Sequence, residues 1–153
     1  MGVTAGLEPL DSIVMDQVTC KGIECWNVHS TVIANSFVIS GGVTFQDSSD
    51  VVLTQTTIAN APANAVSFLP GMSRWITLNQ LTIRQAVGSG IVGGGHHGAI
   101  ANNVIANHQL YGIDAEPSLQ SNLVTANRVS GNGTAAVRGL TDPSHVIANN
   151  IGF

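Results

Sequence analysis

The chain has 153 residues, 44% of them hydrophobic, which is enough for one domain with a continuous apolar core. Only 9% of the residues are charged, and nine acidic residues against five Lys and Arg give a net charge of −4, which excludes the basic surface that holds nucleic acid. No window offers the roughly 18 apolar residues of a membrane span, and the amino end lacks the basic start and apolar run of a signal peptide. Neither nucleic acid nor a membrane is therefore expected as a partner.

The amino end and the two cysteines give the first expectations in chain order. Residues 1–10 show no amphipathic helix, and we expect them to be an N-terminal extension of a domain that covers residues 11–153. Cys20 and Cys25 are the only cysteines, and no second pair accompanies them to form a zinc site. Small buried thiols are favoured over a disulfide or a redox pair.

From residue 11 onward the sequence repeats. The segments "STVIANSFVI", "GAIANNVIANH", "SNLVTANRVSGN" and "SHVIANNIGF" are variants of one pattern, with a period of about 22 residues. An amide or carboxylate marks each unit, at Asp16, Asn35, Gln55, Asn79, Asn103, Asn127 and Asn150.

Three mostly apolar columns accompany these markers. Three positions before the markers stand Ile13, Val32, Val52, Ile76, Ile100, Val124 and Ile147. Two positions after them stand Val18, Phe37, Thr57, Leu81, Ile105 and Val129. A third column, often just after a glycine, comprises Ile23, Val43, Val66, Ile91, Ile113 and Val137. Short runs rich in Val, Ile and Thr between Gly, Asn, Ser and Pro indicate two or three strands in each unit.

Three strands in about 22 residues are too few for a propeller blade, and the leucine pattern of leucine-rich repeats is missing. The sequence therefore predicts an all-β fold, a right-handed parallel β-helix of about six coils of 19–25 residues. Equal positions of successive coils stack at about 4.8 Å, so that Ile and Val pack on their own kind. The amides are expected at tight corners, where Asn tolerates the left-handed conformation and bonds to the Asn one coil along.

These coils, from about Asp11 to Phe153, resemble the repeats of the pectate-lyase-like superfamily. That superfamily includes polysaccharide lyases, glycoside hydrolases, alginate C5-epimerases and phage tailspikes. The resemblance implies a carbohydrate-associated protein, located outside the cell or on the surface of a cell or virion. Because the sequence stops at "IANNIGF", within a coil, we expect a fragment of a longer chain, with stacking on flanking domains or self-association at open ends.

"YGID" at residues 111–114 is the first candidate for chemistry. In a plain structural coil, Ile113 lies in the inward column, Gly112 precedes it and Asp114 points outward. The segment also resembles the start of the alginate C5-epimerase motif Tyr-Gly-apolar-Asp-Pro-His, whose tyrosine and histidine exchange the C5 proton. Here Ala115 and Glu116 occupy the Pro and His positions.

Two catalytic alternatives involve this coil. In the first, Arg138 aligns one coil beyond Asp114 and neutralises a uronate carboxylate, while Tyr111 donates or accepts a proton. The structural alternative is that Asp114 and Arg138 form an exposed ion pair. In the second, Asp114 and Glu116 lie two apart on one strand, at roughly 7 Å, a separation that suits glycoside hydrolysis.

A second candidate is a polar ledge along one corner. Six positions before the markers stand His29, Ser49, Ser73, His97, Ser121 and Ser144, and one position later Ser30, Asp50, Arg74, Gly98, Asn122 and His145. Substrate binding along this ledge is assigned to Arg74, Trp75, His97, Asn122 and His145. Ser, Asn and Asp are also ordinary corner residues, which is the structural alternative.

The "GSGIVGGG" run before His96 lacks the Lys and Ser or Thr of a phosphate loop, and the sequence implies neither a metal site nor a cofactor. The expected function is therefore the binding or presentation of an extended polysaccharide along the ledge. The alternative is a C5-epimerase, lyase or glycoside hydrolase acting at the Tyr111 coil.

Overall fold

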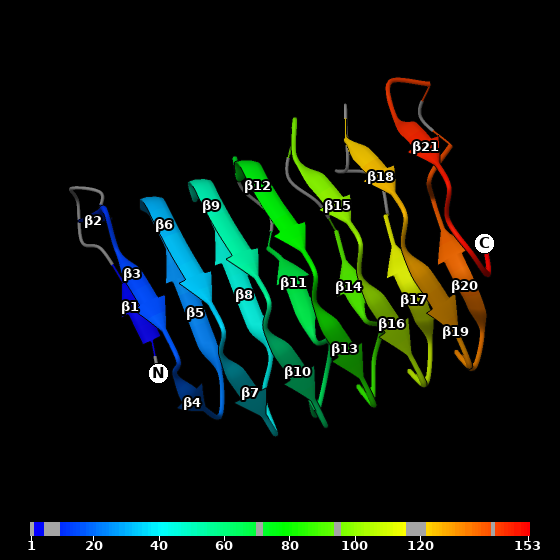
Figure 1. Cartoon of the computed structure of the whole chain (residues 1–153), viewed down its shortest axis with the longest axis horizontal. Helices are drawn as coiled ribbons and strands as arrows, with labels where there is room; N and C mark the ends of the chain where they lie inside the picture. The colour runs from blue at the N-terminus through cyan, green and yellow to red at the C-terminus, as the bar shows by residue number, and fades with distance from the viewer. Residues whose placement is uncertain (1, 5–9, 70–71, 94–95, 116–121, 142) are drawn as a thin grey trace.

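The computed structural model of the chain describes residues 2–4, 10–69, 72–93, 96–115, 122–141 and 143–153. They form an all-β parallel solenoid of about five turns, and no helix occurs within these ranges. Figure 1 shows the coils following one another in chain order along the long axis, from β1 at one end to β21 at the other. The predicted fold class is confirmed. The described part of the chain contains no helix that could span a membrane.

Each coil contributes one strand to each of three parallel sheets. Sheet A contains β1 (Gly2–Thr4), β5 (Ile23–Trp26), β8 (Val43–Gln46), β11 (Val66–Phe68), β14 (Ile91–Val92), β17 (Tyr111–Asp114) and β20 (Ala135–Arg138). Sheet B contains β2 (Leu10–Asp11), β3 (Val14–Asp16), β6 (Val28–Ala34), β9 (Ser49–Thr54), β12 (Arg74–Asn79), β15 (Ala99–Ala101), β18 (Leu123–Thr125) and β21 (Val146–Ala148). Sheet C contains β4 (Thr19–Cys20), β7 (Phe37–Ile39), β10 (Thr57–Ala59), β13 (Thr82–Arg84), β16 (Val104–Ala106) and β19 (Arg128–Ser130).

The third apolar column is confirmed in full. Strand pairing places its members directly above one another in sheet A, from Ile23 to Val137. The first five are fully buried in the lumen of the solenoid, and Val137 packs against the same cluster. Sheet A also includes β1, which pairs with β5, so strand pairing already occurs within the segment that we expected to be an extension.

The other two columns are only partly as predicted. The lumen column of sheet B is Met15, Ile33, Leu53, Leu78, Ile100, Val124 and Ile147, and that of sheet C is Cys20, Val38, Ile58, Ile83, Ile105 and Val129. The prediction is wrong by one residue at Val32, Val52, Phe37 and Thr57, and Val32 and Phe37 face solvent with exposed fractions of 37% and 51%. It is wrong by two residues at Ile13, Val18, Ile76 and Leu81. Since side chains alternate along a strand, a shift of one residue exchanges the two faces.

The predicted amide corner consists of two adjacent positions with different roles. The first has a left-handed backbone, with φ between 48° and 56°, at Asn35, Gln55, Gln80, Asn102, Ala126 and Asn149. The second carries the amide ladder: Asn103 Nδ2 donates to Asn127 Oδ1 at 2.9 Å, and Asn127 Nδ2 donates to Asn150 Oδ1 at 3.0 Å. Both expected properties of asparagine therefore occur, on neighbouring residues of the "NN" pairs rather than on one.

Candidate functional site

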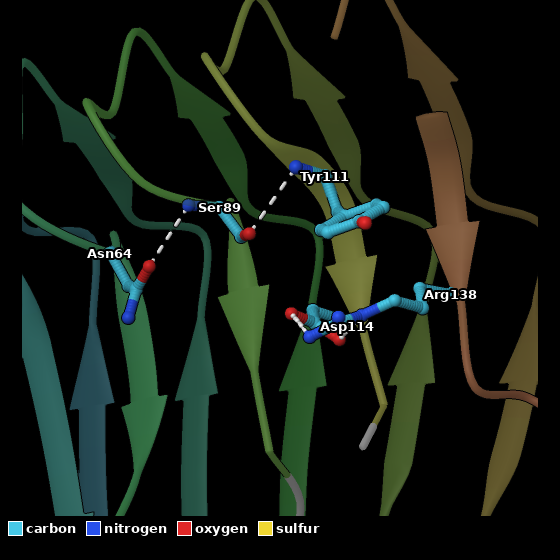
Figure 2. Close-up of polar contacts among 5 residues, drawn as sticks. All are labelled: Asn64, Ser89, Tyr111, Asp114 and Arg138. Carbon is cyan, nitrogen blue, oxygen red and sulfur yellow. Dashed lines mark hydrogen bonds and ion pairs between the residues drawn. The ribbon is translucent and has the colours of Figure 1, made fainter. Parts of the chain in front are cut away.

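Tyr111, Asp114 and Arg138 form a compact cluster on the outer surface of sheet A. Strand pairing sets Asp114 beside Arg138, as the sequence predicted. The guanidinium bonds the carboxylate twice, from Nε to Oδ1 and from Nη2 to Oδ2, each at 2.7 Å (Figure 2). The guanidinium carbon also lies 4.6 Å from the centre of the Tyr111 ring, within cation–π distance.

The pair of Asp114 and Arg138 differs from the exposed ion pair that was the structural alternative to a catalytic role. The Asp114 side chain is 8% exposed, because the Arg138 side chain, itself 42% exposed, covers it. A bidentate contact with one desolvated partner is held more firmly than an ion pair on open surface. The cluster is therefore a fixed group with one phenol and one guanidinium on its outer side. Glu116 lies outside the described residues.

The backbone of Tyr111 is held by Ser89, which is held in turn by Asn64, and the sequence analysis singled out neither residue. Ser89 N–H donates to Asn64 Oδ1 at 2.9 Å, and Tyr111 N–H donates to Ser89 Oγ at 3.2 Å, so one coil supports the next (Figure 2). Asn64, Ser89 and Tyr111 each stand two positions before a member of the third apolar column. This shared spacing is the signal in the sequence that could have identified Asn64 and Ser89.

Gly112 has a steric reason to be glycine. A Cβ at this position would lie 2.2 Å from Val129 Cγ1 and 2.7 Å from the Ala136 carbonyl oxygen. The packed lumen therefore forbids a side chain between Tyr111 and Ile113, whatever the function of the segment.

The polar ledge is present at the corner between sheets A and B, with a different alignment from the predicted one. One column runs through His29, Ser49, Arg74 and His96, and the next through Ser30, Asp50, Trp75 and His97. These eight residues are called the corner strip below. Arg74 and His96 thus occupy the places assigned to Ser73 and His97, and Ser73 is buried.

Trp75 is the most prominent side chain of the corner strip. It is 53% exposed, and its ring stacks on that of His97 with centroids 5.0 Å apart and an interplanar angle of 25°. Its backbone is left-handed, with φ 56°, a conformation that bulky residues rarely adopt.

Asn122 and His145, which were also assigned to the ledge, belong instead to a capping column in which Asn122 is buried and His145 is half-buried. Gly98 N–H donates to Asn122 Oδ1 at 2.7 Å, and Asn122 N–H donates to His145 Nδ1 at 3.3 Å. Asn122 is 3% exposed. Both side chains therefore connect coils from within the corner and do not lie on the outer face of the strip.

Other titratable groups lie inside the solenoid. Burial raises the pKa of the Cys25 thiol to about 12, and both Cys20 and Cys25 are free thiols. Burial lowers the pKa of His108 to about 4. Among the described residues, no three His, Cys, Asp or Glu side chains lie close enough together to hold a metal ion.

A shallow hollow of about 390 Å³ lies on sheet A toward the amino end, lined by Lys21, Gly22, Ile23, Glu24, Gly41, Gly42 and Thr44. Glu24 and Thr44 share their outward column with Asp114 and Arg138. Four strand spacings separate Glu24 from Asp114, about 19 Å. The hollow and the cluster are thus separate features of one face.

Comparison with known proteins agrees with this geometry. The family described as "Right handed beta helix region" matches residues 21–151. Among solved structures, a mutant of the periplasmic alginate epimerase AlgG is similar, with a TM-score of 0.68, 12% identity, and coverage of 92% of this chain and 45% of that one. The A-module of the Azotobacter vinelandii mannuronan C-5 epimerase AlgE4 is also similar, with a TM-score of 0.55, 13% identity, and coverage of 94% of this chain and 52% of that one.

At these identities the similarity establishes the fold alone, and the chain spans about half the length of either structure. No curated protein matches the chain.

Proposed function

Because the chain belongs to the right-handed β-helix family, whose coils expose a continuous side surface, we propose that it binds an extended polysaccharide along the corner strip. Two structures of similar fold are named as alginate and mannuronan epimerases, which supports a carbohydrate ligand. The proposal concerns binding and does not require catalysis by this chain.

The observation that carries the proposal is the exposed Trp75 ring stacked on His97, beside Arg74. The left-handed backbone that the corner imposes at Ser30, Asp50 and His97 also occurs at Trp75, where a bulky side chain makes it cost on the order of 1 kcal/mol. Flat aromatic rings stack on the apolar faces of sugars, while the neighbouring Arg and His side chains donate hydrogen bonds to hydroxyl or carboxylate oxygens. The columns of the strip run along the solenoid axis, which suits a linear chain of sugars.

Trp75→Ala is expected to weaken polysaccharide binding about tenfold, equivalent to about 1.4 kcal/mol, since it removes the platform but leaves the lumen unchanged. Affinity electrophoresis and calorimetry on polyuronate and neutral polysaccharides measure the effect. Phe37→Ala is the matched control, because Phe37 is 51% exposed on sheet C, away from the strip. Equal affinity of the Trp75 variant and the native chain would refute the assignment of the strip.

A second function is favoured by the cluster of Tyr111, Asp114 and Arg138. In an epimerase or lyase, Arg138 would neutralise the uronate carboxylate, and Tyr111 would donate or accept the proton at C5. Asp114 would hold the guanidinium in place through the bidentate contact. Hydrolysis by the Asp114 and Glu116 pair is the remaining alternative.

For this second function, Asp114→Asn is expected to abolish turnover of an acidic polysaccharide and to leave the circular dichroism spectrum unchanged, because the lumen is not altered. Mass spectrometry and proton NMR of the products detect cleavage or C5 inversion. Glu24→Gln changes a carboxylate in the same outward column and serves as the control. If the native chain yields no product on any polyuronate, or the Asp114 variant retains its rate, the catalytic role fails and the binding proposal is unaffected.

A further inference from the structure

The basic side chains of the corner strip gather in its carboxyl-terminal half. Arg74 pairs with His96 on the next coil, and His97 follows His96 at the corner. Arg74 and His97 are exposed, and His96 is half-buried. Within the described ranges none of these three side chains takes part in an ion pair, in contrast to Arg138. Their nitrogen atoms are therefore available to a ligand that carries negative charge.

Acidic side chains are absent from the coils of these basic residues. No Asp or Glu occurs from residue 51 to residue 113. The nearest described acids on the amino-terminal side are Asp11, which pairs with His29, and Asp47 and Asp50, which lie two coils or about 10 Å before His97. A positive charge on His97 therefore has no described carboxylate beside it.

The described titratable groups on the carboxyl-terminal side already have partners. His145 lies two coils beyond His97, and its Nδ1 accepts the Asn122 N–H at 3.3 Å. Asp114 has its own ion-pair partner on sheet A. The remaining histidine, His108, is buried at another corner. The strip therefore carries the histidines that a polymer can reach from outside.

The net charge of the strip depends on pH through its three histidines, because histidine is the side chain whose charge changes between about pH 8 and pH 5. With neutral histidines the eight residues of the strip carry no net charge, since Arg74 and Asp50 cancel, and the rest of the chain carries the whole net charge of −4. With all three histidines protonated, the strip carries a charge of +3. A negatively charged polymer is then attracted to the strip and repelled by the acidic remainder of the surface.

We propose that the corner strip binds a polysaccharide that carries carboxylates, and that this binding strengthens as the pH falls because His96 and His97 become protonated beside Arg74. The inference rests on the proposed function of the strip and adds the class of its ligand and its regulation. Carboxylates keep their negative charge down to about pH 4, so the polymer and the histidines are oppositely charged between about pH 4 and pH 6.5. Arg74 and His96 stand about 4.8 Å apart on paired strands, close to the length of one sugar residue. Neighbouring carboxylates of the polymer can therefore each meet a cation beside the Trp75 ring.

The test compares polygalacturonate with its methyl ester, which has the same backbone without the charge. Calorimetry in low salt at pH 7.5 and pH 5.5 measures the affinity of the full chain for each polymer. Polygalacturonate is expected to bind about tenfold more tightly at pH 5.5, equivalent to about 1.4 kcal/mol, and the ester equally at both pH values. Raising the salt concentration to about 0.5 M should reduce this rise, since exposed charges are screened. Circular dichroism establishes that the chain is folded at both pH values.

The matched variant is His96→Gln with His97→Phe, which keeps a flat ring against Trp75 but removes both titrating groups. It is expected to lose most of the rise in affinity, whereas Arg128→Gln, which removes an exposed cation from sheet C, is expected to retain it. A rise that also occurs in the double variant or with the ester, or affinities that do not depend on pH, would overturn the inference and leave binding by the strip intact if Trp75→Ala still weakens it. If neither polymer binds at either pH, the inference and the proposed function both fail.

Discussion

Ile100→Asp is expected to lower the free energy of unfolding by more than about 4 kcal/mol, enough to unfold a domain of ordinary stability. Ile100 is 3% exposed, and strand pairing places it between Leu78 and Val124 in the lumen. The substitution removes roughly 1.5–3 kcal/mol of apolar burial and introduces a carboxylate that the lumen offers no partner. In a stacked solenoid each coil contacts only its neighbours, so the defect interrupts the core in both directions.

Circular dichroism during urea and thermal denaturation measures this loss. Val104→Asp is the matched control: it introduces the same carboxylate in the same coil, but Val104 faces solvent and is 45% exposed. We expect the control to remain within about 0.5 kcal/mol of the native chain. Equal unfolding midpoints for the two variants would mean that Ile100 does not line the lumen.

Much of the fold could be predicted from the sequence because stacking makes equal positions repeat. The column that includes Ile91 and Ile113 was assigned correctly at every coil, since a nearby glycine or small residue marks the entry to sheet A. The columns of sheets B and C were aligned on the amides instead. The marker precedes the left-handed position at Asp16 and Asn79, coincides with it at Asn35, and falls on the ladder position in later coils, as at Asn103. The alignment therefore slipped by one or two residues.

The candidate sites were predictable to a smaller extent. The pairing of Asp114 with Arg138 follows from the repeat length alone, but the burial of the carboxylate depends on how the Arg138 side chain folds back over it, which repeat length does not encode. The predicted columns of the corner strip were misaligned because the coil between Asp50 and Trp75 differs in length from the neighbouring coils. The stacking of Trp75 on His97 depends on the left-handed backbone at both residues, which sequence rules assign to Gly and Asn.

The chain is expected to lose up to about 3 kcal/mol of stability as the pH falls from about 6.5 to about 4, because of His108. His108 is 2% exposed, and its Nδ1 accepts the Ala86 N–H at 3.1 Å. Burial holds its pKa at about 4, below the ordinary 6.5. The unfolded chain binds a proton between these values and the folded chain does not, so acid favours unfolding. The full stability is present above pH 6.5.

His108→Asn tests this prediction with a residue that the corner already accommodates. His108 N–H donates to Asn132 Oδ1 at 3.1 Å, as Asn103 N–H donates to Asn127 Oδ1, so an asparagine at residue 108 can continue an amide ladder. Urea unfolding should show that the native chain has a lower free energy of unfolding at pH 5 than at pH 7.5, and that His108→Asn lacks this loss. His29→Asn, on the corner strip, should retain it. An acid loss of equal size in native chain and variant would show that another group is responsible. A variant as stable as the native chain at pH 7.5 and more stable at pH 5 would identify the His108 corner as the acid-sensitive joint between coils.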